Sequence, residues 1–141
     1  MKDYNMVFIF KKLEEEEELE ILNKLLDMIN ADVYHYLGDS TLKFKVNILG
    51  KENRNVKFKK VTVTKDKFYA YVIMLDPMEY IRKPSKVNVN KLKKKMVRLA
   101  SKICNEVNCK YAFIDDNLEN LDSSDGLYVN SNRKYNGRIY V

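Results

Sequence analysis

The sequence contains no tryptophan and no glutamine, and it has little cysteine, proline, glycine and histidine. Its two cysteines, Cys104 and Cys109, are too few for the disulfide framework of a small secreted protein, and their spacing excludes a Cys-x-x-Cys motif. With His35 as the single histidine, they do not form a zinc-binding pattern. We therefore expect two packed thiols near the end of a helix, no metal site and no cofactor.

Long apolar runs are also missing. The apolar stretch within residues 1–10 is short and is followed by Lys11 and a run of glutamates. This is too little for the apolar region of a signal peptide or for a membrane-spanning helix. The sequence therefore predicts a cytoplasmic protein without a membrane partner.

Glycine is too sparse for a nucleotide-binding loop. The four glycines lie at positions 38, 50, 126 and 137, so no two of them are close enough to form a glycine-rich phosphate-binding motif. Lysine and glutamate are abundant instead, and together with the missing glutamine they lean towards a thermophilic protein. The many asparagines oppose this trend, although an AT-rich genome explains lysine, asparagine, isoleucine and tyrosine together. A thermophile with such a genome is therefore our hypothesis for the source.

A chain of 141 residues fits one domain, and we expect residues 1–141 to form a single α+β domain. The hydrophobic pattern predicts strands at Tyr4–Phe10, Val33–Leu37, Thr41–Leu49, Val56–Thr64, Lys67–Leu75 and Lys110–Ile114, and helices at Leu13–Asn30 and Asn90–Val107. Asn88 or Asn90 is expected to cap the second helix. The predicted fold has two helices packed on one face of a mainly antiparallel sheet, in the order β-α-ββββ-α-β. Its four central strands form a meander, and Asn136–Gly137 is typical of a further C-terminal hairpin.

The fourth predicted strand has an irregular pattern. Val56 and Phe58 fall on one parity, whereas Val61 and Val63 fall on the other. An extra residue in one strand of an antiparallel pair would account for such a change of parity. We therefore expect a β-bulge at Lys59–Lys60 that turns all four apolar side chains inward.

The net charge of +6 is unevenly distributed along the chain. Residues 14–39 carry nine acidic side chains and one basic one, whereas residues 43–110 carry nineteen basic and five acidic ones. Residues 115–125 are acidic again, with five carboxylates and no basic residue. Such sorting produces a directional field, so the local potential matters more than the net charge. It favours an oriented contact with a macromolecule over catalytic chemistry.

The basic residues are expected on two surfaces. On the second helix they lie opposite the apolar stripe, and on the meander they lie opposite the core with two tyrosines beside them. The predicted contacts for a nucleic acid or another polyanion are Lys43, Lys45, Lys57, Lys59, Tyr69, Tyr71, Lys91, Lys94, Lys95, Arg98 and Lys102. Lysines would neutralise phosphates, and tyrosines would stack on unpaired bases. Solubility and the protection of strand edges also explain surface lysines, and arginine, the better base reader, is scarce.

Candidate catalytic or metal-binding groups are few. Histidine is the side chain that most often changes charge near neutral pH, but His35 lies in an apolar strand pattern that is typical of a structural histidine. Asp115 and Asp116 stand at the end of a strand and are followed by further carboxylates, a composition that suits a hard cation. A solvated acidic loop accounts for them as well.

We therefore expect a small non-enzymatic binding or interaction protein. Its favoured partner is another protein or a second copy of the chain in a homo-oligomer. The alternative is a nucleic acid held by the lysine and tyrosine side chains of the sheet and by the basic helix. An enzyme with a site near His35 or the Asp115–Asp116 loop is the third interpretation.

Overall fold

The computed structural model describes residues 3–63, 68–115 and 139–140. Its elements are β1 (Tyr4–Lys11), α1 (Glu15–Met28), β2 (Asp32–Gly38), β3 (Thr41–Ile48), β4 (Lys51–Val63), β5 (Phe68–Leu75), η1 (Pro77–Glu79), α2 (Lys86–Val107), β6 (Tyr111–Asp115) and β7 (Ile139–Tyr140). Within these residues the strands form one antiparallel sheet in the order β2-β3-β4-β5-β1-β6-β7. This confirms the predicted α+β fold and its element order. The hairpin predicted at Asn136–Gly137 lies outside the described residues.

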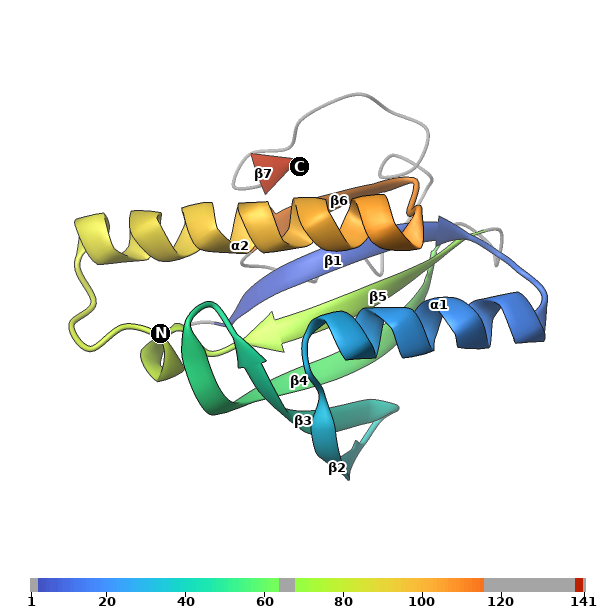
Figure 1. Ribbon diagram of the computed structural model, residues 1–141, viewed down its shortest axis with the longest axis horizontal. Coiled ribbons are helices and arrows are strands. Elements are labelled where there is room, and N and C mark those ends of the chain that lie inside the picture. Colours follow the sequence, from blue (N-terminus) through green and yellow to red (C-terminus); the bar gives the residue numbers. More distant parts are fainter. Residues whose placement is uncertain (1–2, 64–67, 116–138, 141) are drawn as a thin grey trace.

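Both helices lie on one face of the sheet (Figure 1). Their apolar sides and the strand residues of one parity form the main core. Leu25 of α1 and Ile29 at its C-cap are completely buried. The buried residues of α2 recur at helical spacing and are Leu92, Met96, Ala100, Ile103 and Val107. Within the described part of the chain, no helix combines the length and the apolar composition that crossing a bilayer requires.

β1 lies inside the sheet, between β5 and β6. All residues from Tyr4 to Phe10 are buried, which explains why this strand is apolar on both faces instead of alternating. Asn5 is the polar member of the run, and its side-chain amide donates a hydrogen bond of 3.1 Å to the backbone carbonyl of Asp115 on β6. The apolar run of residues 4–10 is therefore that of a strand inside the sheet.

The β-bulge predicted at Lys59–Lys60 is wrong. β4 pairs with β5 without a break from residue 56 to residue 63, so the parity of its side chains is constant over this stretch. Phe58 faces the helices, whereas Val61 faces the opposite side of the sheet and packs on a second apolar cluster there. The change of phase reflects a sheet with apolar side chains on both faces, not an inserted residue.

The second apolar cluster lies on the face opposite the helices. It consists of the buried residues Val7, Ile9, Ala70, Val72 and Phe113. These residues belong to β1, β5 and β6, which are neighbours in the sheet. This part of the second face is therefore apolar, and the four predicted sheet lysines lie beside it on β3 and β4.

α2 begins at Lys86, earlier than the predicted start at Asn90. Its cap is Ser85, whose hydroxyl accepts a hydrogen bond of 3.1 Å from the backbone N–H of Asn88. The prediction that Asn88 or Asn90 caps this helix is therefore wrong. A residue that precedes a proline rarely adopts helical dihedral angles. Lys83 precedes Pro84, so the helix does not begin before Pro84.

Cys104 and Cys109 form a disulfide, so the prediction of two packed thiols is also wrong. α2 ends at Val107, and Asn108 adopts the left-handed conformation (φ 55°, ψ 47°) that often terminates helices. The chain then turns back, and the backbone N–H of Cys109 donates a hydrogen bond of 3.1 Å to the carbonyl of Cys104. This turn brings the two Cα atoms to 5.1 Å, a separation that a disulfide spans.

Candidate functional site

Tyr69 and Tyr71 do not join the lysine surface of the sheet, and the prediction that they do is wrong. Both lie on the helix-facing side of β5, with exposed fractions of 3% and 1%. The Tyr71 hydroxyl donates a hydrogen bond of 3.1 Å to the Glu18 carboxylate of α1. Burial, followed by the nearby Glu18 carboxylate, raises the pKa of Tyr69 to about 12, and the same causes raise the pKa of Tyr71. Aromatic rings buried in the core do not stack on bases.

The four sheet lysines lie on the face opposite the helices, as their alternation predicts. They are Lys43, Lys45, Lys57 and Lys59. Lys43 and Lys57 are direct cross-strand partners on β3 and β4. A small pocket of about 160 Å³ beside these two lysines is also lined by Asp3, Asp76 and Glu79. Three carboxylates beside two ammonium groups leave little positive potential at this place.

α2 presents a more uniformly basic surface. Residues 86–107 carry seven basic side chains and a single acidic one, Glu106. Five of these basic side chains are exposed and lie near one another at helical spacing. We call this set the α2 ridge, and its members are Lys91, Lys94, Lys95, Arg98 and Lys102. None of these five side chains forms an ion pair with a residue in the described part of the chain. The positive potential of the ridge is therefore not cancelled by direct partners there.

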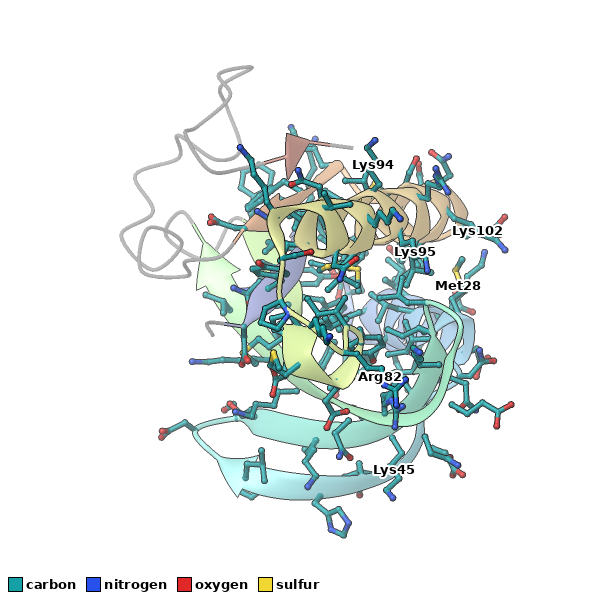
Figure 2. The ribbon with its side chains drawn as sticks, turned by 90° about the vertical axis from the view of Figure 1, so that its left-hand side faces the viewer. Met28, Lys45, Arg82, Lys94, Lys95 and Lys102 are labelled. Carbon is teal, nitrogen blue, oxygen red and sulfur yellow. A yellow bond between two sulfur atoms is a disulfide. The ribbon has the colours of Figure 1, made fainter. Side chains whose placement is uncertain are left out.

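The two basic surfaces are separate (Figure 2). Lys94 and Lys95 lie on different sides of α2, whereas Lys45 lies on β3, in the hairpin of β2 and β3. Arg82, from the segment between η1 and α2, lies between the helix and the hairpin. The structure therefore brings the α2 ridge close to Arg82 and keeps it apart from the sheet lysines.

A pocket of about 230 Å³ lies where the Arg82 segment meets α2, and we call it the basic pocket. Its described lining residues are Leu49, Tyr80, Ile81, Arg82, Asn88, Lys91, Leu92 and Lys95. Three of them are cationic and none is acidic. Sequence reasoning missed Arg82 and Tyr80, because they belong to an irregular segment between two prolines. The adjacent basic pair Arg82–Lys83, just before a helix, was the available signal.

Two buried donors have no acceptor within the described structure: the Tyr80 hydroxyl, whose residue lines the basic pocket, and Nε of Arg54, which is not among the lining residues. Tyr80 lines the pocket and is 7% exposed. Burial and the Glu79 carboxylate raise the pKa of the Tyr80 hydroxyl, whereas the Arg54 guanidinium lowers it. Tyr80 and Arg54 are thus close enough to interact electrostatically. Buried donors without acceptors are rare in folded proteins, because water or a bound group usually accepts a hydrogen bond from them.

His35 and Asp115 do not come together in one cluster. His35 is exposed on the edge strand β2, where its cross-strand partner is Lys43. Asp115 is buried at the end of β6, which lies on the other side of the central strands, and Asp116 falls outside the described residues. Among the residues that the structure describes, no three His, Cys, Asp or Glu side chains are grouped to hold a metal ion.

Comparison with known proteins does not place the chain in a family. It matches no protein-family model, and no curated protein matches it significantly. The α2 ridge and the basic pocket together form an arrangement that is suited to binding anions.

Proposed function

We propose that this protein is a non-enzymatic binding protein that holds a nucleic acid by its phosphate backbone along the α2 ridge. The proposal is supported by five exposed cations on one helix, none of them paired with a carboxylate of the described residues. Phosphates that bind such cations release condensed counterions, so binding gains free energy without any contact to a base. Tyr69 and Tyr71 do not stack on bases in this proposal, because both rings are buried.

The composition of the ridge suits contacts with the backbone. From Lys91 to Lys102 the ridge extends about 16 Å at a rise of 1.5 Å per residue, enough for a few phosphates. Four of its five members are lysines, which act as point charges and lack the fork of donors with which arginine recognises guanine. We therefore expect little sequence preference and a strong dependence of affinity on salt.

Fluorescence anisotropy with a labelled single strand and a labelled duplex tests this proposal. The ridge variant combines Lys94→Glu, Lys95→Glu and Arg98→Glu, and a control of equal charge change combines Lys43→Glu, Lys45→Glu and Lys57→Glu on the sheet. We expect a wild-type log–log salt slope of about −2 to −4, corresponding to two to five phosphate contacts. The ridge variant should lose at least about tenfold in affinity and the sheet control less than about threefold. Absence of wild-type binding at low salt, or equal losses in both variants, would contradict the proposal.

A protein partner or a second copy of the chain is the second candidate, and the edge strand β2 supports it. Tyr34 and Tyr36 are 64% and 67% exposed on this strand, which ends the described sheet. Exposed aromatic side chains beside unpaired strand backbone are typical of an edge that pairs with another chain. Light scattering should then show a dimer that Tyr34→Ser with Tyr36→Ser converts to a monomer, while Val87→Ser, at another exposed apolar position, leaves it intact. A wild-type monomer at high concentration that co-purifies with no other protein would argue against this candidate.

We further propose a cytoplasmic location and a thermophilic source. Disulfides are rare in the cytoplasm except in hyperthermophiles, so the disulfide Cys104–Cys109 and the composition rich in lysine and glutamate support the same source. A melting temperature in the ordinary mesophilic range, about 45–65 °C, would count against a thermophilic source.

A further inference from the structure

We infer that the basic pocket binds a phosphate monoester, the group carried by a nucleotide or by the phosphorylated end of a nucleic acid strand. This goes beyond the backbone contacts proposed for the α2 ridge, because the pocket would recognise an end group or a small ligand. The strand-end form of the inference rests on the proposed function, whereas the nucleotide form does not. Three features support it: the charge of the pocket, the buried Tyr80 hydroxyl and the size of the pocket.

The charge of the pocket favours a dianion. Lys91 and Lys95 are one helical turn apart and so lie on the same side of α2, and Arg82 lines the pocket from the preceding segment. Like charges in one concavity repel each other unless an anion lies among them, and the concave shape concentrates their field. A phosphate monoester carries about −1.5 to −2 charges at neutral pH, more than a carboxylate or a backbone phosphodiester. Three cations therefore suit a monoester best.

The buried donors are a second and independent observation. The Tyr80 hydroxyl belongs to a side chain that is more than nine-tenths buried, and it has no acceptor within the described residues. The Nε–H of Arg54 is buried without an acceptor as well. An anionic oxygen in the pocket would accept a hydrogen bond from the Tyr80 hydroxyl, whereas a bound cation would leave this donor unsatisfied. Water also accepts such bonds, so a variant that removes the Tyr80 hydroxyl belongs in the test.

The size of the pocket favours an esterified phosphate over the free ion. A liquid water molecule occupies about 30 Å³, and a phosphate group, whose five heavy atoms are covalently bonded, needs the space of only a few water molecules. The pocket has about 230 Å³, which leaves space beside the phosphate. The apolar side chains of Leu49, Ile81 and Leu92 line the same pocket and suit the carbon atoms of a sugar.

Titration of the full chain with a nucleoside monophosphate, the matching nucleoside and inorganic phosphate tests the pocket, with calorimetry or NMR as the readout. We expect the monophosphate to bind, inorganic phosphate to bind more weakly and the nucleoside not to bind. Tyr80→Phe should weaken monophosphate binding about tenfold, the effect of removing one hydrogen bond to a charged group. Lys91→Gln, at an exposed position, should weaken it as well, and it keeps the test valid if Tyr80→Phe does not fold. Lys86→Gln is the matched control and should leave the affinity unchanged, because Lys86 is an exposed residue of α2 that belongs neither to the ridge nor to the lining of the pocket.

Two oligonucleotides, one with a terminal phosphate and one with a terminal hydroxyl, separate the two sources of the monoester. Preference for the phosphorylated end, lost in Lys91→Gln, supports strand-end binding, and monophosphate binding without such a preference supports a free nucleotide. If the monophosphate does not bind and the ends are not distinguished, or if Tyr80→Phe and Lys91→Gln bind it like the wild type, the inference is overturned. Failure of the pocket to bind the monophosphate would leave salt-dependent binding of nucleic acid strands unaffected. Conversely, absence of strand binding would overturn the proposed function but would not affect binding of the monophosphate.

Discussion

Lys60 of β4 and Glu18 of α1 form an ion pair on the helix-facing side of the sheet. Glu18 also accepts the hydrogen bond of the Tyr71 hydroxyl, so one carboxylate connects the first turn of the helix to two strands. Lys60 thus shares the parity of the buried residues Val56 and Phe58, and a helix residue provides its counter-charge. This relationship explains the irregular pattern of β4 and leads to the first prediction.

Glu18→Gln should destabilise the protein by about 1 kcal/mol. The side chains of Lys60 and Glu18 are 43% and 23% exposed, so their pairing contributes near the upper end of the range for surface ion pairs. Denaturant unfolding measures the loss, and a double-mutant cycle with Lys60→Met isolates the pairwise contribution. Glu16→Gln, an exposed change in the same helical turn, should have little effect. Equal losses for the two glutamate variants would show that the pair contributes nothing.

Stability should fall at strongly alkaline pH. Tyr69 has a pKa of about 12 in the folded chain against an ordinary value near 10, because burial and Glu18 disfavour its anion. Between pH 10 and pH 12 the folded state binds more protons than the unfolded state. The contribution of Tyr69 to the free energy of unfolding is therefore complete below pH 10 and is lost as the pH rises through 12. Denaturant unfolding at several pH values, with tyrosinate absorbance as a second readout, checks this. Ionisation of every tyrosine near pH 10 in a still folded protein would contradict the prediction.

Reduction of the disulfide Cys104–Cys109 should lower the stability of the native chain by at most about 2 kcal/mol, the chain-entropy value for such a short loop. The loss should be moderate because the helix and its left-handed terminator already hold the two residues near each other. Thermal unfolding with and without reductant measures the effect. The double variant Cys104→Ser with Cys109→Ser is the control, since reductant should not shift its midpoint. Two titratable thiols in the oxidised native protein would refute the disulfide.

Ser85→Ala should destabilise the protein by about 1 kcal/mol, because the hydroxyl that accepts from the Asn88 N–H is lost at the start of α2. Asn90→Ala should change the stability by less than about 0.5 kcal/mol, since Asn90 is an exposed residue inside the helix. Chemical denaturation of the two variants compares the true cap with one of the caps that the sequence suggested. A larger effect at Asn90 would place the start of the helix where the sequence predicted it.

Local patterns predicted most of the fold. The alternation of Thr41–Ile48 and the helical spacing of the α2 stripe are properties of a single segment, so they can be recognised without knowledge of any neighbour. The candidate site was less predictable. The ridge could be found because it lies on one helix, but the basic pocket combines α2 with an irregular segment and with the turn at Leu49. No local period relates these three parts of the chain.

Periodicity and charge are carried by neighbouring residues, so the amino-acid pattern specifies the strands, the helices, their order and the basic character of α2. What each side of an element meets depends on packing between distant segments. Strand alternation sets the two faces to which Tyr69 and Lys59 belong, but it does not say which face the helices cover. In the structure the Tyr69 ring is buried under the helices, and Lys59 faces the other way. The disulfide and the meeting of Arg82 with Lys91 and Lys95 depend in the same way on turns whose path the local pattern does not specify.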